Sequence, residues 1–251
     1  MDQEVKVKSL KKALDLLECF TVRTPELGIT ELSDRLGLYK SNVHNIISTF
    51  EKSGYIEKNP DNSKYRLGMK ILELSYIINS SLGLHKIVHP FISALSNEVN
   101  EVVYFAIPKD PLILYLEGVY PSYSYSARSM VGETAEMYCT SLGKAILAHL
   151  PEERRIRAIE EQSMTEFTPT TIVDRQVLLQ ELEHIRQTGY SIDNMEHEFG
   201  IKCLGMPVFH RDGSLLGAIS ISGPSLRIDD TAVERYVQLL LNCAHEISQR
   251  L

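Results

Sequence analysis

The stretch ITELSDRLGLYKSNVHNIISTFEKSG, residues 29–54, decides the fold of the N-terminal part of the chain. Its first part repeats apolar residues at helical spacing and predicts a short helix that starts at a Thr30 N-cap and stops at Gly37. Its second part predicts another helix, which Gly54 is placed to end. One face of that helix is apolar, and the other carries amine, hydroxyl, amide and imidazole groups. Two short helices across a tight glycine turn, the second with such a polar face, are typical of a helix-turn-helix.

The sequence on either side of this motif completes a small domain. Upstream, apolar residues from Leu10 to Phe20 repeat at helical spacing and predict a first helix. Downstream, GYIEKNPDNSKYRLG (54–68) has two short strand-like runs around an Asn-Pro-Asp-Asn turn, which predicts a β-hairpin wing. Residues 1–68 are therefore expected to form a winged helix-turn-helix domain.

The remaining sequence predicts a linking helix and a second domain. Residues 69–83 place apolar side chains on more than one side of a helix, so we expect this helix to pack against a partner subunit. Beyond it, hairpin turns join strand-like runs between helical stretches, which favours an α+β fold. One predicted helix starts at Leu84, and three others cover 141–149, 173–188 and 229–251. The predicted strands cover 101–108, 112–119, 203–209 and 215–222.

The net charge of −7 is distributed unevenly along the chain. Residues 1–68 carry 11 Lys and Arg against 10 Asp and Glu, whereas the remainder carries 15 against 23. A segment that binds an anionic polymer should therefore be the N-terminal one, acting through local positive charge. No signal-peptide pattern and no run of about 18 apolar residues occurs, so we expect a cytoplasmic protein without membrane contact.

Six segments of the chain are distinctive, namely VKSLKKALDLLECF (7–20), ITELSDRLGLYKSNVHNII (29–47), GYIEKNPDNSKYRLG (54–68), SLGKAILAHLP (141–151), GYSIDNMEHEFGIKCLGMPVF (189–209) and AISISGP (218–224). They resemble segments of the IclR family of bacterial transcription regulators, in the order in which that family has them. The resemblance implies a ligand-responsive DNA-binding regulator with a winged helix-turn-helix (1–68), a dimerising linking helix (69–83) and a GAF-like effector domain with an antiparallel sheet (84–251). It also implies a homodimer or homotetramer, and repression of a catabolic operon as the commoner role.

The predicted recognition helix departs from the family pattern, which reads close to Lys-Ser-Thr followed by His-Arg, because Asn42 and Asn45 replace the Thr and the Arg. Each amide offers a donor and an acceptor, which suits the N6/N7 edge of adenine in the major groove of an operator duplex. We expect the neighbouring groups to contact phosphate or sugar, with affinity that falls steeply as salt rises. The alternative is an ordinary solvated helix face. The predicted DNA-binding residues are Lys40, Ser41, Asn42, His44, Asn45, Lys58, Lys64 and Arg66.

The resemblance also implies a pocket for a small effector, often a carboxylate. A helix beginning near Ser141 leaves free N–H groups that suit a carboxylate, and Ser220 and Ser222 share one side of a strand. Asp193 needs a ligand hydroxyl or a proton of its own, so a hydroxy acid fits. The predicted effector-binding residues are Ser141, Leu142, Asp193, Cys203, Ser220 and Ser222, with Ala127 and Ala135 widening the pocket where the family often has larger apolar side chains.

An enzyme is the main alternative from another class of function. Cys203 would be the nucleophile, His197 or His210 the base and Asp193 the orienting acid. No local motif of a thiol hydrolase surrounds Cys203, and a helix-turn-helix has no part in such chemistry. We therefore predict no catalytic residues, no cofactor and no enzyme activity.

Two further alternatives remain open. Asp193, Glu196, His197 and Glu198 place metal-ligand types within six positions, but neither HExxH nor a zinc-ribbon spacing appears, and the four cysteines form no CxxC pair. We therefore predict no metal site. An RNA-binding or purely structural winged helix is the other alternative, and the large second domain makes it unnecessary.

Overall fold

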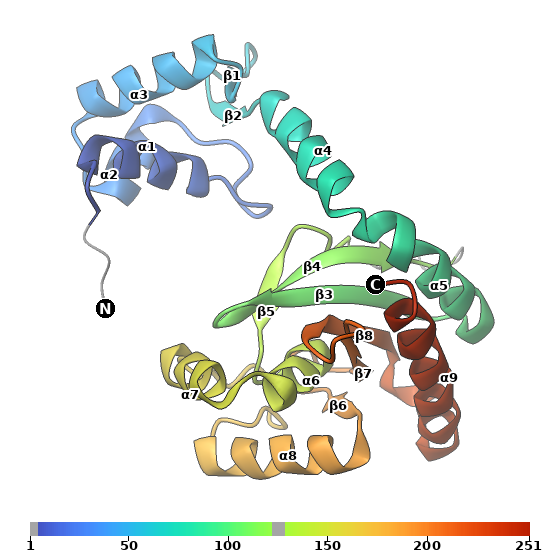
Figure 1. Ribbon diagram of the computed structural model, residues 1–251. Coiled ribbons are helices and arrows are strands. Elements are labelled where there is room, and N and C mark those ends of the chain that lie inside the picture. The colour runs from blue at the N-terminus through green and yellow to red at the C-terminus, as the bar shows by residue number, and fades with distance from the viewer. Residues whose placement is uncertain (1–4, 122–128) are drawn as a thin grey trace. The chain divides into compact units, whose positions relative to one another are not determined.

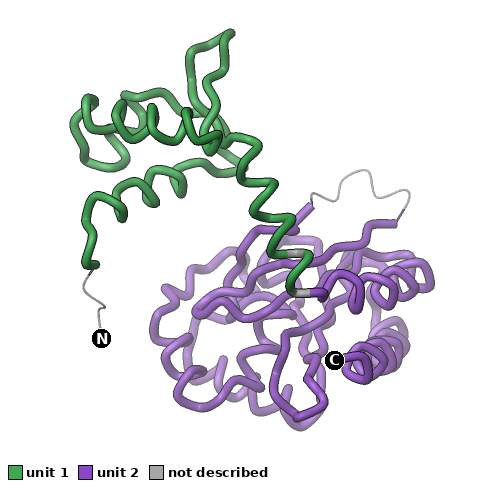
Figure 2. The backbone as a smooth tube through the Cα atoms, turned by 45° about the horizontal axis from the view of Figure 1, so that its top comes forward, with its two compact units in different colours: residues 1–82 green, residues 83–251 purple. Residues whose placement is uncertain are grey.

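The computed structural model describes residues 5–121 and 129–251, and the chain divides into two compact units, residues 1–82 and 83–251 (Figure 2). The first unit is a winged helix-turn-helix, as the sequence predicted. Its elements are α1 (Lys8–Glu18), α2 (Ile29–Leu36), α3 (Lys40–Lys52), β1 (Ile56–Lys58), β2 (Tyr65–Leu67) and α4 (Lys70–Leu82).

The three helices of the first unit and its β-hairpin share one small apolar core. Leu16 of α1, Leu32 of α2 and Val43 of α3 are fully buried there, together with Ile56 of the hairpin. Leu32 and Val43 come from the apolar faces that the helical spacing predicted. On α1 the predicted stripe of Leu10, Ala13, Leu14, Leu17 and Phe20 was wrong in part, because Leu10 and Leu14 are exposed while Leu16, which lies outside that stripe, is buried. Gly37 ends α2 in the left-handed conformation, at φ 63°, which glycine adopts without steric cost.

The start of α2 differs from the prediction. The helix begins at Ile29 with Gly28 as its N-cap, so Thr30 lies inside the first turn. The carboxylate of Glu31 accepts the Gly28 N–H at 2.7 Å and supplies the cap that a threonine hydroxyl was expected to supply.

The hairpin is tied to the segment before α2 by contacts that the sequence did not predict. The Glu26 carboxylate accepts hydrogen bonds from the side-chain amides of Asn59, at 2.8 Å, and Asn62, at 2.6 Å. Leu27 exchanges two backbone hydrogen bonds with Tyr65, each of 2.9 Å. These contacts hold the loop of the wing in a defined position.

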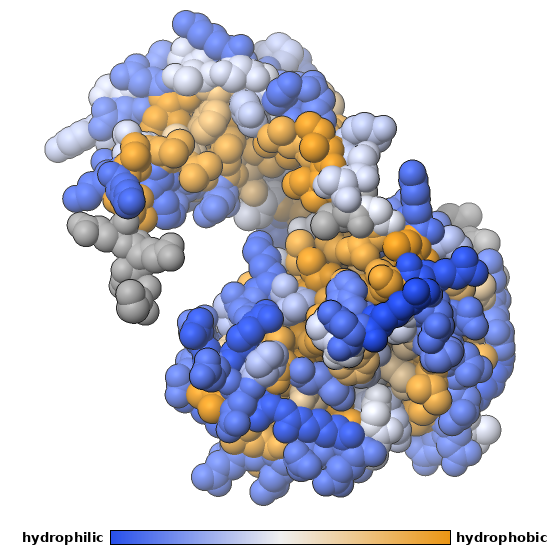
Figure 3. All heavy atoms as spheres, in the orientation of Figure 1, coloured by the Kyte–Doolittle hydropathy of each residue, from blue (hydrophilic) through white to orange (hydrophobic). Residues whose placement is uncertain are grey.

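α4 carries large apolar side chains that nothing in its own unit covers. Figure 3 shows apolar groups gathered along this helix. The exposed residues are Met69, just before the helix, and Leu72, Leu74, Tyr76, Ile77 and Ile78 within it. Apolar surface of this kind marks an interaction site more often than a solvated face.

The second unit is an antiparallel six-stranded sheet with helices on both faces, which confirms the α+β prediction (Figure 1). The strand order is β5-β4-β3-β8-β7-β6. The strands are β3 (Val102–Lys109), β4 (Leu112–Val119), β5 (Thr134–Glu136), β6 (Ser191–Asn194), β7 (Ile201–Phe209) and β8 (Leu215–Pro224). The helices are α5 (Leu84–Val99), α6 (Ser141–His149), α7 (Glu152–Glu161), α8 (Arg175–Thr188), the 3₁₀ turn η1 (Ser225–Arg227) and α9 (Asp230–Ser248).

The two faces of the sheet belong to different apolar layers. α5 and α9 cover one face, where Phe105, Ile219 and Ile221 are fully buried. α6 packs on the other, with α7 and α8 outside it, over Ala106 and Ala218. Successive residues of a strand therefore alternate between the layers.

α6 lies unusually close to the sheet at Gly205 of β7. A Cβ atom at Gly205 would stand 2.6 Å from the carbonyl oxygen of Ser141, so only glycine fits there. The N-terminal end of α6 is thereby held directly over β7 and β6.

The structure also contains elements that the sequence did not predict, namely α7, β5 and β6. Asp193, which the sequence analysis assigned to no helix or strand, lies within β6. Among the described residues, no helix is both long enough and apolar enough to cross a membrane.

Candidate functional site

The exposed face of α3 carries the five predicted DNA-binding residues of that helix. Lys40, Ser41, Asn42, His44 and Asn45 are all exposed. The apolar side of the same helix is buried in the core of the first unit. The structure therefore brings these five side chains together on one accessible surface.

Tyr39 adds an aromatic group to this surface that sequence reasoning missed. It is the N-cap of α3, and 83% of its surface is exposed. The signal available in the sequence was an aromatic residue, Tyr39, directly before Lys40, the first residue of the polar helix face. Its ring can contact a base methyl group or a sugar.

The three predicted cations of the wing differ in their surroundings. The Lys64 ammonium lies 3.0 Å from the Glu31 carboxylate, and the Arg66 guanidinium lies 3.5 Å from that of Glu57. Lys58 stands over the ring of Tyr65, 5.8 Å from its centre. Within the described residues no carboxylate forms an ion pair with Lys58, so its charge is the one most readily offered to a phosphate.

In the second unit, strand register places most of the predicted effector residues on one face of the sheet. Asp193 pairs with Cys203, and Cys203 pairs with Ser222. The Cys203 thiol donates a hydrogen bond of 3.1 Å to the Ser222 hydroxyl. Ser220 pairs with Tyr104 of β3 in the adjacent row on the same face. The register thus brings Ser222 together with Cys203, 19 positions away in the chain, and with Asp193, 29 positions away.

The start of α6 faces the same part of the sheet. Thr140 is the N-cap, and its hydroxyl accepts the Gly143 N–H at 3.1 Å. The N–H groups of Ser141 and Leu142 precede the first intrahelical bond and have no partner within the helix. The Leu142 side chain belongs to the apolar core, so this residue can offer a ligand its backbone N–H only.

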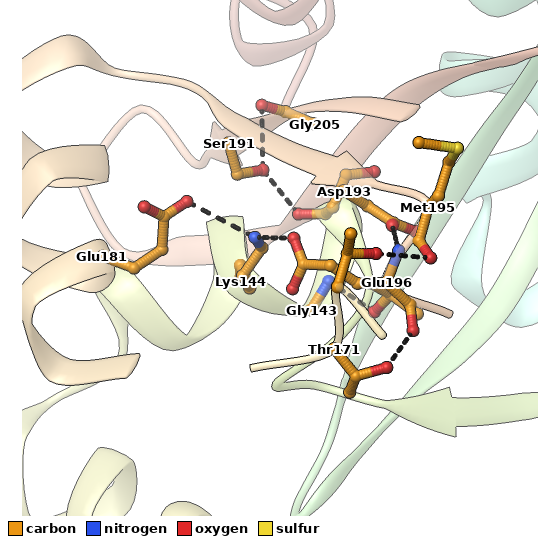
Figure 4. Close-up of polar contacts among 12 residues, drawn as sticks. Gly143, Lys144, Thr171, Glu181, Ser191, Asp193, Met195, Glu196 and Gly205 are labelled. Atoms are coloured by element: carbon orange, nitrogen blue, oxygen red, sulfur yellow. Dashed lines mark hydrogen bonds and ion pairs between the residues drawn. The ribbon is translucent and has the colours of Figure 1, made fainter. Parts of the chain in front are cut away.

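A buried ion cluster lies beneath this helix start (Figure 4). The Lys144 ammonium, with 1% of its side chain exposed, lies 2.5 Å from the Glu196 carboxylate and 3.3 Å from that of Glu181. The second carboxylate oxygen of Glu196, Oε2, has no hydrogen-bond partner among the described residues. The Asp193 carboxylate accepts the backbone N–H of Glu196 at 2.7 Å. Sequence reasoning did not identify this cluster, because its members come from three separate elements.

Burial changes the ionisation of the groups on this face. Together with a smaller effect of the Glu196 charge, it raises the pKa of the Asp193 carboxyl to about 7. It also raises the pKa of the Glu196 carboxyl, against the pull of Lys144. Burial raises the pKa of the Tyr104 and Tyr115 hydroxyls too; the two rings meet edge to face with centres 5.3 Å apart. Near neutral pH the Asp193 carboxyl is therefore partly protonated, and the two tyrosine hydroxyls on this face keep their protons.

The surroundings of Cys203 do not suit a nucleophile. Burial raises the pKa of its thiol well above the ordinary value, whereas a reactive cysteine needs a lowered one. His197 lies beside Glu136 and the Phe167 ring, and His210 lies where β7 turns into β8. In the part of the chain that the structure describes, no hydrogen bond joins either histidine to Cys203.

Two other predicted positions have separate outcomes. Ala135 is buried on β5, at 4% exposure, beside the apolar layer under α6. Ala127 lies outside the described residues. Asp193, Glu196, His197 and Glu198 do not form a metal-ligand group among the residues described.

Two sequence profiles match the chain. The IclR helix-turn-helix domain matches residues 9–60, and the bacterial transcriptional regulator IclR C-terminal domain matches residues 77–249. The chain belongs to the IclR family of bacterial transcription regulators. The helix-turn-helix and the sheet domain are thus the two expected parts of one DNA-binding regulator.

Individual IclR-family proteins agree with this assignment over nearly the whole chain. The HTH-type transcriptional regulator XynR of Escherichia coli (strain K12) is 30% identical over 245 residues, which cover 98% of this chain and 97% of that protein. The transcriptional repressor IclR of the same strain is 28% identical over 96% of this chain and 89% of its own length. The Thermotoga maritima IclR crystal structure has a TM-score of 0.76 at 28% identity, covering 97% of this chain and 98% of that one. These relatives are regulators, which agrees with the prediction of no enzyme activity and gives the Cys203 enzyme no support.

We expect the wing lysines to contribute unequally to DNA binding. Lys58→Ala should weaken operator binding and lower the slope of log affinity against log salt by about 0.9. Lys64→Ala should change both less, because its ammonium is already paired with Glu31. Fluorescence anisotropy at several salt concentrations measures both, with Lys109→Ala in the second unit as the control. Equal losses for the two wing variants would contradict this ranking.

The raised pKa of Asp193 predicts a pH-dependent stability. Between the ordinary pKa of 3.8 and the folded pKa of about 7, the unfolded chain releases the proton while the folded chain keeps it. Stability should therefore fall by about 2 to 3 kcal/mol from pH 5 to pH 8 through this group. Asp193→Asn should remove that loss, whereas Asp230→Asn, an exposed control, should keep it. Urea denaturation at the two pH values tests this, and parallel pH profiles for wild type and Asp193→Asn would refute it.

Proposed function

We propose that this IclR-family chain is a repressor of a catabolic operon whose DNA binding is altered by a small hydroxylated carboxylic acid. One observation carries the proposal: Asp193, Cys203, Ser220 and Ser222 share one face of the sheet beside the open N-terminal end of α6. The same chain carries a winged helix-turn-helix, so a ligand bound at the polar site would have a DNA-binding activity to control. The protein would act in the cytoplasm, where the operator is.

The donors and acceptors on this face define the class of effector. The helix-start N–H groups of Ser141 and Leu142 suit a carboxylate. A protonated Asp193, together with Ser220 and Ser222, can exchange hydrogen bonds with ligand hydroxyls. A related structure from Microbacterium hydrocarbonoxydans, 24% identical with a TM-score of 0.84 over 96% of this chain and 98% of that one, is an IclR homolog complexed with 4-hydroxybenzoate. That ligand is itself a hydroxylated acid. Repression is supported by relatives such as the acetate operon repressor of Salmonella typhimurium, 26% identical over 96% of this chain and 89% of that protein.

The DNA end would read sequence through two asparagines. Asn42 and Asn45 are exposed on α3 and can each pair with the N6/N7 edge of an adenine. Lys40, Ser41 and His44, on the same surface, would contact phosphate or sugar together with Lys58 of the wing. Lys64 and Arg66 would contribute less, because Glu31 and Glu57 already neutralise part of their charge.

A second copy of the chain would cover the apolar side chains of α4. Leu72 and Ile77 are 64% and 60% exposed, which a lone helix in water does not sustain without cost. Dimerisation through α4 would pair two winged helix-turn-helix domains, and an operator would then hold two half-sites about 34 to 36 Å apart. The effector would act by changing the relative preference of two dimer arrangements.

A selection experiment tests the regulator. The purified protein is mixed with sheared genomic DNA from its source, and the retained fragments are sequenced at moderate and high salt. We expect a few enriched, partly palindromic sites, and genes beside them that name candidate hydroxy acids. Asn45→Ala should lose these sites while keeping weak non-specific binding, and uniform retention by wild type would refute the proposal.

Effector response is tested on the sites so found. Saturating effector should change operator affinity for wild type and for Ser214→Ala, a control in the exposed β7–β8 turn. Ser222→Ala should bind the operator normally but need about tenfold more effector. An operator affinity that no hydroxy acid changes would overturn the sensing role and leave DNA binding intact.

The oligomer is tested by charge substitution in α4. Leu72→Asp combined with Ile77→Asp should shift the molecular mass, measured by light scattering on a sizing column, towards the monomer. Leu179→Asp on α8, which is also exposed, serves as the matched control. A double variant with unchanged mass would show that α4 is not the contact between copies.

A further inference from the structure

Two histidines share one face of α5, away from the effector residues. His85 and His89 are four positions apart, which places both side chains on the same side of a helix. Their ring centres lie 4.7 Å apart. Histidines at this spacing can point their ring nitrogens at one point in space, an arrangement that helical metal sites use.

Glu117 of β4 completes the group from a different element. It pairs in register with Phe105, which is buried under α5 and α9, so Glu117 lies on that same face of the sheet. Its Oε1 lies 2.7 Å from Nδ1 of His85, and its Oε2 lies 3.3 Å from Nδ1 of His89. One ligand atom from each of the three residues lies within 4.8 Å of the others.

We propose that His85, His89 and Glu117 form a binding site for a divalent transition metal ion of the Zn²⁺ type. Two imidazole nitrogens and one carboxylate oxygen are a donor set that zinc accepts in open, three-ligand sites. Bonds of about 2.0 to 2.2 Å in a tetrahedral arrangement need donors roughly 3.3 Å apart. The separations of 2.7 and 3.3 Å join the two imidazoles to different oxygens of Glu117, and one ligand atom from each residue lies within 4.8 Å of the others. Side-chain rotations would therefore bring the three donors around an ion.

Charge and exposure favour a metal over a hydrogen-bonded trio. The Glu117 side chain is 15% exposed. Among the described residues, its ion-pair partners are the imidazoles of His85 and His89. A divalent ion bound between the three side chains would neutralise the negative charge of the Glu117 carboxylate. The His85 and His89 side chains are 58% and 43% exposed, so water can fill the remaining coordination positions. Imidazole donors exclude Mg²⁺ and Ca²⁺, which prefer oxygen ligands.

A metal here would join the first turns of α5 to the sheet. α5 is the first element after α4 in the chain, and His85 lies three positions after the last residue of α4. β4 also supplies Tyr115, which lies on the other face of the sheet, in the apolar layer under α6. The ion would therefore fix the start of the effector domain to a strand that also borders the proposed effector site. The metal site does not depend on the proposed repressor function.

Zinc titration of the full-length, untagged protein after EDTA dialysis tests the site. We expect isothermal titration with ZnCl₂ to show one strong site per chain, and CoCl₂ to give the visible absorption of a tetrahedral ion at the same stoichiometry. His89→Ala and Glu117→Gln should each weaken this binding by at least about tenfold. His184→Ala, which removes an exposed histidine on α8, should leave it unchanged.

Thermal denaturation provides a second readout. Zinc should raise the melting temperature of wild type and His184→Ala but not that of His89→Ala, because an ion that binds only the folded chain stabilises it. Melting curves in EDTA show whether each variant folds, and His85→Ala, at the most exposed position, replaces any variant that does not. Absence of zinc binding by wild type would leave only a hydrogen-bonded His-Glu-His group. Equal binding by wild type and all three ligand variants would place the ion elsewhere, and either result overturns the proposal.

Discussion

Both faces of the six-stranded sheet are covered by helices, and this constraint shapes the second unit. Every residue of a central strand then faces one of two layers, the one under α5 and α9 or the one under α6. β8 shows the consequence, since Ile219 and Ile221 fill the layer under α5 and α9 while Ser220 and Ser222 point to the side of α6. A hydroxyl in such a layer benefits from a polar partner, and the Cys203 thiol of the neighbouring strand donates a hydrogen bond to Ser222. The polar site is therefore a product of the same alternation that builds the core.

The close contact of α6 with the sheet determines where that polar site can open. Gly205 lets the helix start lie against β7, and the Ser191 hydroxyl donates a 2.6 Å hydrogen bond to the Ser141 carbonyl. Lys144, one turn further along, is buried and must have counter-charges, which Glu196 and Glu181 provide. A buried ion without them would cost several kcal/mol. The ion cluster thus locks the segment after β6 beneath the helix whose N–H groups would meet a ligand.

The first unit is small and nearly neutral, so its acidic residues must be placed where they do not oppose DNA binding. Its acidic residues are used to position the motif: Glu31 caps α2, and Glu26 holds the loop of the wing through Asn59 and Asn62. The cations that remain unpaired can then act locally on DNA although the whole chain is negative.

Sequence periodicity and turn chemistry were enough to predict the helix-turn-helix, the wing, the helix at Ser141–His149 and the main strand pairs, because these are set by residues close together in the chain. The same local reasoning put the two serines of β8 on one side. It erred at the start of α2, where Thr30 was predicted as the N-cap but the helix begins one residue earlier, at Ile29, with Gly28 as the N-cap. It also missed α7, whose apolar stripe is short, and β6, which is only four residues long.

What tertiary structure alone decided are the contacts between residues far apart in sequence. The sheet register brings Asp193 to Cys203 and Ser222, packing buries Lys144 against Glu196, and α5 lays His85 and His89 beside Glu117. No spacing rule links such pairs, because strand order and helix placement set their distances. The sequence by itself therefore determined the family, the motif that faces DNA and the identity of the candidate side chains. Their burial, their ionisation and their partners followed only from the fold, since each depends on which distant element lies opposite.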